Sequence, residues 1–213
     1  MFTLYDYLPS QNAYKVRLLL SHLDIKYETQ IVSIFEGEGQ NPDYLAVNPT
    51  GAVPALRLAD GRVIAESMAI LWFLAKGTAY LPDDPYNQAK ILQWLSFEND
   101  YLQNSIGSLR FWTLTGKVEG RPIEMVEAKR KIALKVLNIL ERELTAREFL
   151  VDGSYTIADI ACFAYTHLAE DGNLSLQPYP NLVKWLDRVR TQPGFLPTIY
   201  PYSVDPHAGN ELP

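Results

Sequence analysis

The sequence predicts two domains of different class, an α/β domain at the N-terminus and an all-α domain after it. Over residues 1–77, short apolar and aromatic runs typical of strands alternate with apolar residues at helical spacing. Around Gly77–Pro85 a stretch rich in glycine and proline interrupts this pattern, as an exposed linker does. From Tyr86 onward only helical spacing is found. We therefore expect an α/β domain over 1–77, a linker over 78–86, an all-helical domain over 87–200 and a tail over 201–213.

The first domain is expected to run in the order β-α-β-α-β-β-α. Asp60-Gly61 separates two short apolar runs, which is a strong signal for a tight hairpin. The first two strands are joined through a helix and are therefore expected to be parallel, with a right-handed crossover. The expected elements are strands at 2–5 and 27–34, helices at 14–23 and 43–46, a hairpin of strands at 55–58 and 62–65, and a helix at 67–75.

The second domain is expected to consist of four main helices. Thr156-Ile157-Ala158-Asp159 is a capping box ahead of an apolar run, because Thr156 can cap the helix while Asp159 reaches back to the backbone of Thr156. The expected helices are a long, bent one around 91–109, an amphipathic one over 125–144, one after the capping box, and one near 180–191.

Composition excludes several classes of function. The net charge of −6 does not suit a nucleic-acid groove, and no apolar run is long enough to span a membrane. Cys162 is the single cysteine, so no intrachain disulfide can form, and a cytoplasmic location is expected because no signal peptide opens the chain. The three histidines, His22, His167 and His207, are too scattered to suggest a metal site. We expect no metal and no nucleic-acid or membrane partner.

The segment Asn48–Leu56 carries the most informative motif. A strand is expected to begin after Pro54, because proline cannot donate a hydrogen bond to a sheet. If the Val53-Pro54 bond is cis, the main-chain groups of Val53 point outward and can pair with an extended ligand, although only about one X-Pro bond in twenty is cis. Glu66-Ser67 opens the next helix, where free amides favour a carboxylate, unless the pair only starts that helix. Together these elements suit a small acidic peptide.

Four features in this order resemble the glutathione transferase family along nearly the whole chain. Each is weak alone, but their common register across a change from α/β to all-α is specific. The features are Ser10-x-Asn12-x-x-Lys15-Val16, the Val53-Pro54 turn, Glu66-Ser67, and the capping box Thr156–Asp159. The resemblance implies a thioredoxin-like N-terminal domain, a cis bond before Pro54, and a homodimer.

The family activates the thiol of glutathione and adds it to electrophiles. A hydroxyl or amide that donates a hydrogen bond to sulfur stabilises the thiolate, which is the nucleophile. The resemblance makes Ser10 and Asn12 the candidate catalytic residues, with Ser10 favoured over Asn12. Ser10 could instead act only as a helix N-cap, and Tyr7 remains a lesser alternative because some members place a tyrosine there.

For the tripeptide, the resemblance assigns its γ-glutamyl carboxylate to Ser67, its amino group to Glu66, and its cysteinyl part to the main chain of Val53, ahead of Pro54. Glutathione is then a co-substrate, and no separate cofactor is expected.

Gln40 stands where the resemblance leads us to expect a basic residue for the glycyl carboxylate. An amide donates a hydrogen bond without charge assistance. We therefore expect modest affinity for glutathione, unless Lys15, Arg17 or a partner subunit contributes a cation.

The resemblance places the electrophile between the two domains. An aromatic stripe at helical spacing is more often core than pocket, but its abundance favours an apolar or flat acceptor. The candidate residues are Tyr14, Tyr101, Ser105, Leu109, Phe111 and Trp112.

Other functions stay open. Glutathione-dependent reduction of disulfides or peroxides would use the same thiolate, and Asn12 keeps it as an alternative. A catalytically silent interaction module would keep the fold without turnover; Gln40 favours it weakly, and the otherwise intact motif set opposes it. Isomerisation of maleylacetoacetate is not expected, because the serine- and cysteine-containing first-loop motif is missing. Cys162 lies in an apolar run and is expected to be an inert core residue.

Overall fold

The computed structural model describes residues 1–212, which form two compact units. The first unit combines residues 1–74 with the chain from Pro193 onward, and the second unit spans 75–192. The all-helical unit therefore ends at Gln192 and does not continue to residue 200, and the predicted tail belongs to the first unit. The sequence prediction placed these two boundaries near residue 77 and at residue 200.

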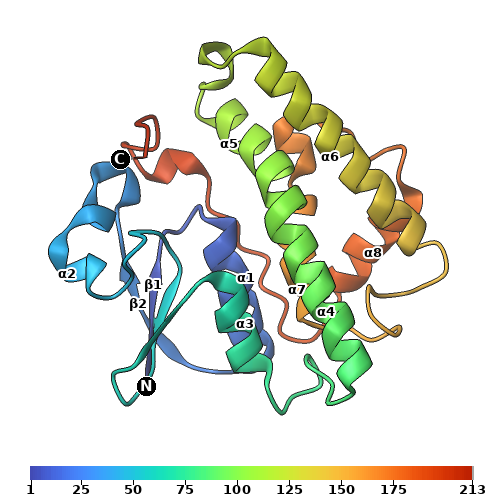
Figure 1. Cartoon of the computed structure of the whole chain (residues 1–213), viewed down its shortest axis with the longest axis horizontal. Coiled ribbons are helices and arrows are strands. Elements are labelled where there is room, and N and C mark those ends of the chain that lie inside the picture. The colour runs from blue at the N-terminus through green and yellow to red at the C-terminus, as the bar shows by residue number, and fades with distance from the viewer. Residues whose placement is uncertain (213) are drawn as a thin grey trace. The chain divides into compact units, whose positions relative to one another are not determined.

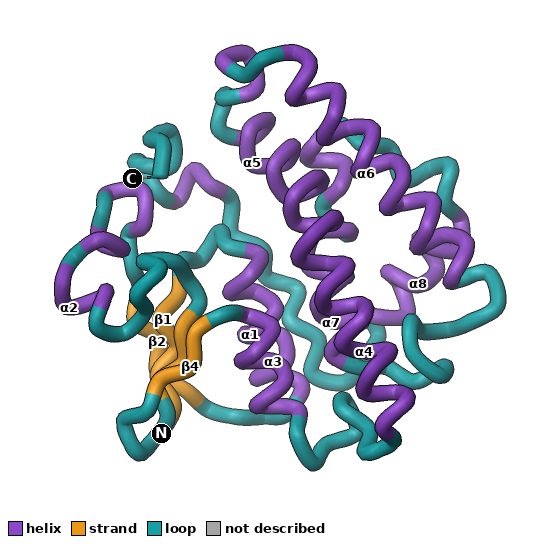
Figure 2. Tube along the Cα trace, viewed as in Figure 1, coloured by secondary structure: helices purple, strands orange, loops and turns teal. Residues whose placement is uncertain are grey.

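The first unit is built on a four-stranded sheet with strand order β2-β1-β3-β4. β1 is parallel to β2 and antiparallel to β3, which is antiparallel to β4, so the sheet is mixed, as the predicted order required. Figure 2 shows α1 and α3 on one side of the sheet and α2 on the other. The strands are β1 (Phe2–Asp6), β2 (Tyr27–Ile31), β3 (Ala55–Arg57) and β4 (Val63–Ala65), and the helices are α1 (Gln11–His22), α2 (Pro42–Leu45) and α3 (Ser67–Ala75).

Two elements differ from the sequence prediction. α1 begins at Gln11 and not near Tyr14, because Ser10 caps it one turn earlier than the apolar pattern indicates. β2 stops at Ile31, because the chain turns into two short 3-10 helices, Ile34–Glu36 and Glu38–Gln40.

The core of the first unit lies between the sheet and its two helices. Predicted apolar positions on α1, Val16, Leu19 and Leu20, have no exposed surface. They belong to the same buried set as Leu4 of β1 and Leu56 of β3. Burial of such aliphatic side chains contributes roughly 1.5–3 kcal/mol each to folding.

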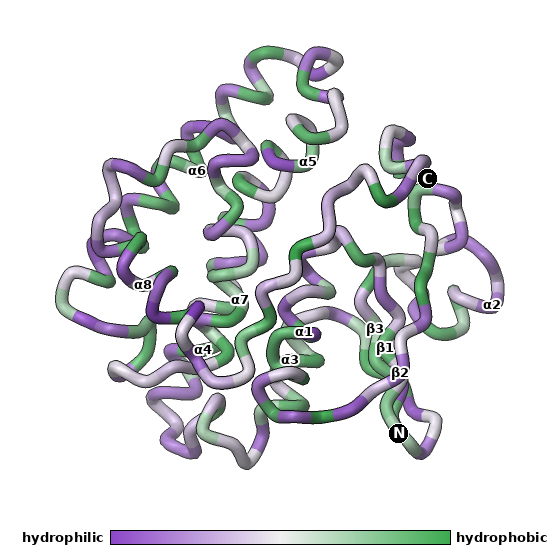
Figure 3. Tube along the Cα trace, turned by 180° about the vertical axis from the view of Figure 1, so that it is seen from behind, coloured by the Kyte–Doolittle hydropathy of each residue, from purple (hydrophilic) through white to green (hydrophobic). Residues whose placement is uncertain are grey.

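The C-terminal segment (residues 193–212) is held along α1, which is why it belongs to the first unit. Ser21 Oγ donates to the carbonyl of Gly194 at 2.7 Å, and the Tyr14 hydroxyl donates to the carbonyl of Leu196 at 2.7 Å. Gly194 has φ +74°, and a Cβ there would lie 2.8 Å from the Ser21 carbonyl oxygen, so only glycine fits this close approach. Figure 3 shows this segment passing alongside α1 toward the C-terminus.

Over its residues 75–192, the second unit contains helices and no strands, apart from isolated bridges between Lys76 and Leu81 and between Val151 and Ser154. The predicted long helix is continuous from Pro85 to Leu114, but its middle, Glu98–Gly107, is π-helical. Figure 1 shows α6 running beside this helix. The helices are α4 (Pro85–Phe97), α5 (Ser108–Leu114), α6 (Ile123–Glu143), α7 (Ile157–Thr166) and α8 (Pro180–Arg190).

The predicted capping box is present at the start of α7. Asp159 Oδ2 accepts from the Thr156 N–H at 3.0 Å, and Asp159 Oδ1 accepts from Leu150 N–H at 3.0 Å and from Trp185 Nε1 at 2.9 Å. The carboxyl is fully buried, and burial raises its pKa to about 6 despite these donors. Asp159 therefore joins α7, the preceding loop and α8 through one side chain.

Within residues 1–212, no helix is long and apolar enough to cross a membrane.

Candidate functional site

The strand register brings three predicted site segments to the same end of the sheet. Tyr5 near the end of β1 pairs with Ala55 at the start of β3, and Ala55 pairs with Ala65 at the end of β4. Because these neighbouring strands are antiparallel, the loop after β1, the turn before β3 and the turn after β4 all lie at this end. These are the segments that carry the serine–asparagine motif, the Val-Pro turn and the Glu-Ser pair.

The first segment presents two polar side chains at the N-terminus of α1. Ser10 Oγ accepts the N–H of Ala13 at 3.3 Å, so Ser10 is an N-cap. A hydroxyl that accepts one hydrogen bond can still donate its own proton, so the cap does not prevent donation to a ligand. Asn12 Oδ1 accepts from Lys15 Nζ at 2.8 Å, which leaves the Asn12 NH₂ group to donate. Ser10 and Asn12 are both partly exposed.

The second segment is the turn before β3. The Val53-Pro54 bond is cis, as the resemblance implied. Within residues 1–212 the main-chain N–H and C=O of Val53 have no hydrogen-bond partner. The preceding carbonyl is held firmly, because Ala52 O accepts from the Tyr44 hydroxyl at 2.6 Å and from Asn48 Nδ2 at 2.7 Å. The free peptide groups of Val53 are thus presented by an ordered turn.

The third segment combines an unusual backbone with a helix N-terminus. Glu66 has φ +70°, a left-handed conformation that costs a non-glycine residue of order 1–3 kcal/mol and is concentrated at functional sites. Its carbonyl accepts from Ile70 N–H at 3.0 Å, so α3 starts directly after it. In the described chain neither the Glu66 carboxylate nor the Ser67 hydroxyl has a hydrogen-bond partner. Both groups remain available for a charged ligand.

Gln40 approaches the Val-Pro turn because two glycines allow close backbone contact. A Cβ at Gly51 would lie 2.5 Å from Gln40 Nε2 and 2.7 Å from the Gly39 carbonyl oxygen, and Gly51 has φ +69°. Gln40 itself is exposed. The structure therefore brings the Gln40 amide next to the turn, two residues from Val53.

The family models match both units of the chain. "Glutathione S-transferase, N-terminal domain" matches residues 9–76, and "Glutathione S-transferase, C-terminal domain" matches residues 108–193. Glutathione S-transferase 1 of Schizosaccharomyces pombe is 30% identical over 213 residues, covering 90% of this chain and 92% of the relative. The chain belongs to the glutathione S-transferase family. Its fold is accordingly thioredoxin-like in the first unit and all-helical in the second.

Solved structures of the glutathione S-transferase family agree with this assignment. A possible glutathione S-transferase of Rhodopseudomonas palustris is 41% identical and has a TM-score of 0.87. The match covers 92% of this chain and 89% of the neighbour. Ure2p in complex with glutathione is 26% identical with a TM-score of 0.82, covering 91% of each chain.

Two further relatives carry names that denote other activities. Disulfide-bond oxidoreductase YfcG of Escherichia coli is 27% identical, covering 91% of this chain and 92% of the relative. Maleylacetoacetate isomerase of Dictyostelium discoideum is 28% identical, covering 91% of this chain and 90% of the relative. Membership in the glutathione S-transferase family therefore leaves the reaction itself to be argued.

The two cations that could have replaced a basic residue at position 40 are engaged elsewhere. Lys15 has no exposed surface and donates to Asn12. Arg17 is 5% exposed, and its guanidinium donates to Asp6 Oδ2 at 2.8 Å and to the Leu8 carbonyl at 2.9 Å. Neither can reach a ligand carboxylate at the surface, so within this chain the expectation of an uncharged donor at Gln40 stands.

Lys15 and Arg17 are polar partners whose roles the sequence prediction missed. The signal was present, because both are charged residues on a helix whose other buried positions are uncharged. Lys15 also stands at i+3 from Asn12, where helical side chains meet.

Tyr7, the lesser alternative donor, is buried and 4% exposed. Burial and the neighbouring carboxyl of Asp205 raise the pKa of the Tyr7 hydroxyl well above its usual range. Its ring packs edge-on against Phe35. Tyr7 therefore faces the C-terminal segment, whereas Ser10 and Asn12 lie partly exposed at the start of α1. That Ser10 or Asn12 donates to a thiol stays a prediction.

Three of the predicted electrophile residues are buried. Tyr14 has no exposed surface and its hydroxyl donates to Leu196, so it is a core residue of the first unit. In the second unit Ser105 is fully buried, with its hydroxyl bonded to the Tyr101 carbonyl at 2.6 Å, and Leu109 is 1% exposed. These three side chains are buried in the described structure, and that they contact an electrophile stays a prediction.

The other three predicted electrophile residues have exposed surface. Tyr101 is 50% exposed. Phe111 and Trp112 are partly exposed and lie beneath Lys117 and Arg121, at 4.5 and 5.3 Å from the ring centroids. That they contact an electrophile stays a prediction.

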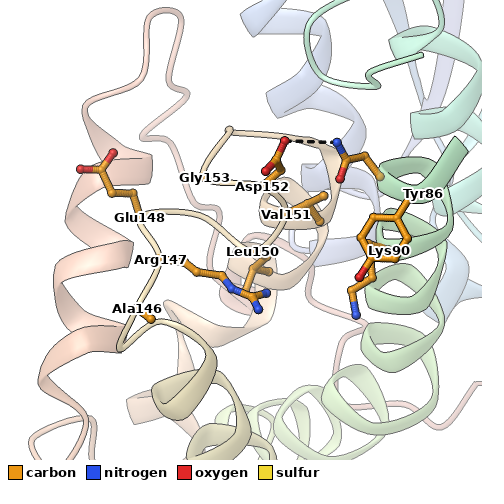
Figure 4. Close-up of a pocket in the computed structure, with 10 residues that line it drawn as sticks. Tyr86, Lys90, Ala146, Arg147, Glu148, Leu150, Val151, Asp152 and Gly153 are labelled. Carbon is orange, nitrogen blue, oxygen red and sulfur yellow. Dashed lines mark hydrogen bonds between the residues drawn. The ribbon is translucent and has the colours of Figure 1, made fainter. Parts of the chain in front are cut away.

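A separate cavity of about 490 Å³ lies in the second unit, between the start of α4 and residues 146–153 (Figure 4). Asn87 Nδ2 donates to Asp152 Oδ2 across it at 3.3 Å. Its two cations already have partners: Lys90 donates to Gln93, and Arg147 pairs with Glu143 at 3.3 Å. No predicted site residue lines this cavity. Within residues 1–212 no group of three or more His, Cys, Asp or Glu side chains could hold a metal ion.

Proposed function

We propose that this protein is a glutathione transferase that ionises the thiol of glutathione and adds the thiolate to an apolar electrophile. The observation that carries the proposal is the convergence of three segments at one end of the sheet, each with unsatisfied polar groups. They are the hydroxyl and amide at the start of α1, the main-chain pair of Val53, and the Glu66-Ser67 start of α3. The relationship to Ure2p, whose structure contains glutathione, supports this choice of ligand.

The three segments match the three functional groups of a γ-glutamyl tripeptide. The N–H and C=O of Val53 can form a short antiparallel pairing with the cysteinyl residue, as an added strand does. The Ser67 hydroxyl and the free amides of α3 would bind the γ-glutamyl carboxylate, which the positive end of the helix favours. The Glu66 carboxylate would bind the α-amino group through a charge-assisted hydrogen bond.

Thiol activation follows from the donors at the start of α1. A free thiol with a pKa of about 8.5 is mostly protonated at neutral pH, and the thiolate is the reactive form. The Ser10 hydroxyl would donate to sulfur while its oxygen keeps the helix cap. The Asn12 NH₂ is a second donor, oriented because Lys15 occupies its oxygen. The N-terminal dipole of α1 acts in the same direction.

A second candidate activity is glutathione-dependent reduction of disulfides or peroxides. It would use the same thiolate with a different acceptor. The free donor group of Asn12 and the relationship to the disulfide-bond oxidoreductase of Escherichia coli favour it. A catalytically silent module is the less favoured alternative. Polar groups for the γ-glutamyl and cysteinyl parts of the tripeptide are present, and only the charge at position 40 is missing.

The test compares Ser10→Ala with Asn12→Ala in assays with an aryl halide, an isothiocyanate and a peroxide. We expect conjugation to fall strongly in Ser10→Ala and to persist in Asn12→Ala. Asp84→Ala is the matched control. Asp84 caps α4 by accepting the Asn87 N–H at 2.8 Å, so this substitution removes a helix cap without removing a thiol donor. The reverse ranking would overturn the assignment of Ser10, and failure to bind immobilised glutathione would favour the silent module.

The affinity for glutathione should be modest, because Gln40 supplies no charge and Lys15 and Arg17 are buried in other contacts. A charge-assisted hydrogen bond is roughly twice as strong as a neutral one. Calorimetric titration measures this directly. A submicromolar dissociation constant would contradict the expectation, and Gln40→Lys should tighten binding.

The protein is also proposed to be a homodimer, as the resemblance implied. Light scattering after size-exclusion chromatography should give about twice the mass of the 24.2 kDa chain. A monomeric mass across the assay concentrations would rule the dimer out.

A further inference from the structure

Arg17 joins the end of β1 to the middle of the turn that leads to Ser10. From the middle of α1, its Nη1 donates to Asp6 Oδ2 at the end of β1, at 2.8 Å, and its Nη2 donates to the Leu8 carbonyl at 2.9 Å. The side chains of Arg17 and Asp6 are 6% and 0% exposed, so water does not compete for these bonds. A planar guanidinium can serve two acceptors at once in fixed geometry, whereas a lysine ammonium cannot reproduce that fork.

The C-terminal segment covers the same guanidinium. The Tyr200 ring lies 5.6 Å from Arg17 Cζ, and the Tyr14 ring lies 6.0 Å from it. Tyr200 is brought there by the hydrogen bonds that Gly194 and Leu196 accept from α1. A cation over an aromatic face is attracted to it, more strongly where water is excluded. The C-terminal segment thus completes the surroundings of Arg17.

We infer that Arg17 is a positioning residue for thiol activation and that Tyr200 holds it in place. The inference deepens the proposed function and rests on it, because it concerns the turn that carries Ser10. That turn is tight, with Ser10 N–H donating to the Tyr7 carbonyl at 2.8 Å. The Leu8 carbonyl lies inside the turn, so releasing it from Arg17 displaces the Ser10 hydroxyl.

The displacement affects the thiol because hydrogen bonds weaken steeply with distance and angle. A poorly placed hydroxyl stabilises the thiolate less, so the pKa of bound glutathione rises. The binding groups at Val53 and Ser67 are on other segments and stay in place. The predicted signature is therefore a higher thiol pKa and a lower kcat, with a smaller change in KM for glutathione.

Two substitutions at Tyr200 test the inference without touching a ligand-binding group. Tyr200→Leu removes the ring and should raise the apparent pKa of bound glutathione by about one unit, which lowers kcat/KM about tenfold at pH values below that pKa. Tyr200→Phe keeps the ring and should behave as wild type. Arg17→Lys should shift the pKa in the same direction and further. Tyr86→Leu removes a 71% exposed tyrosine in the second unit and serves as the matched control.

The readout is the ultraviolet absorbance of the thiolate in each protein–glutathione complex, titrated against pH, beside the pH profile of kcat/KM. A folded Tyr200→Leu protein with the wild-type thiol pKa would overturn the inference, as would a Tyr200→Phe protein shifted as far as Tyr200→Leu. If Arg17→Lys does not fold, the comparison of Tyr200→Leu with Tyr200→Phe still tests the inference. A wild-type complex that never ionises its thiol would overturn the proposed function itself, which distinguishes the two failures.

Discussion

His167 lies one residue after α7, with its ring stacked on Phe163 at 4.3 Å between ring centroids and Nδ1 2.7 Å from the Phe163 carbonyl oxygen. Burial lowers the pKa of this histidine from its ordinary 6.5 to about 4, and nearby Arg190 and Arg110 act in the same direction. The native protein therefore keeps His167 neutral at pH values where the unfolded chain protonates it. Between pH 6.5 and 4 the unfolded state holds more protons, so acidification lowers the free energy of unfolding.

The size of the effect follows from these two pKa values. Protonation linkage with 6.5 in the unfolded chain and about 4 in the folded protein removes about 2 kcal/mol between pH 7.5 and pH 5. Asp159 acts with the opposite sign, because its folded pKa is raised to about 6 and the native state takes up its proton first. Over the same pH interval, proton uptake by Asp159 raises the free energy of unfolding by about 1 kcal/mol. In the wild-type protein this gain partly offsets the loss caused by His167.

His167→Gln removes the titration and should make the free energy of unfolding less sensitive to acid by about 2 kcal/mol over that interval. Urea unfolding at fixed protein concentration, at pH 7.5 and pH 5, measures the difference between variant and wild type. His207→Gln is the control, because that side chain is 43% exposed. An equal loss of stability in His167→Gln and wild type on acidification would refute the reasoning.

Two further substitutions test the close contacts described above. Gly51→Ala should destabilise the first unit by about 1–3 kcal/mol and weaken glutathione binding, because its φ is +69° and the added Cβ meets the Gly39 carbonyl. Gly61→Ala is the control, since Gly61 also has a positive φ but faces open space. In a thermal melt it should destabilise the protein less, and glutathione binding should be unchanged. Trp185→Phe should lower the free energy of unfolding in urea by about 1–3 kcal/mol, because the buried Asp159 carboxyl loses the donor at 2.9 Å. An unchanged free energy would show that this carboxyl is protonated in the native state or finds another donor.

Local patterns were enough to predict most of the elements. The Asp60-Gly61 turn predicted the β3–β4 hairpin, and the Thr156–Asp159 box predicted the start of α7, because each depends on a few adjacent residues. The π-helical segment Glu98–Gly107 was only anticipated as a bend, since its hydrogen-bond register is set by packing and not by composition.

The candidate site was predicted as separate motifs, and the register of the sheet explains why they meet. The sequence could not show which polar side chains already form hydrogen bonds within the folded protein. Lys15 and Arg17 looked available for a ligand, but tertiary contacts with Asn12, Asp6 and Leu8 engage them. Such contacts depend on burial, which apolar spacing does not reveal.

The first unit is discontinuous in sequence, and this has a consequence for how the protein is made. Synthesis proceeds from the N-terminus, and domains tend to fold as they emerge from the ribosome. Residues 1–74 emerge early, but the segment that begins at Pro193 and completes this unit is translated only after residues 75–192. The N-terminal unit is therefore uncovered along α1 while the whole helical unit is synthesised. A premature stop just before Pro193 would leave the first unit incomplete and the second unit whole.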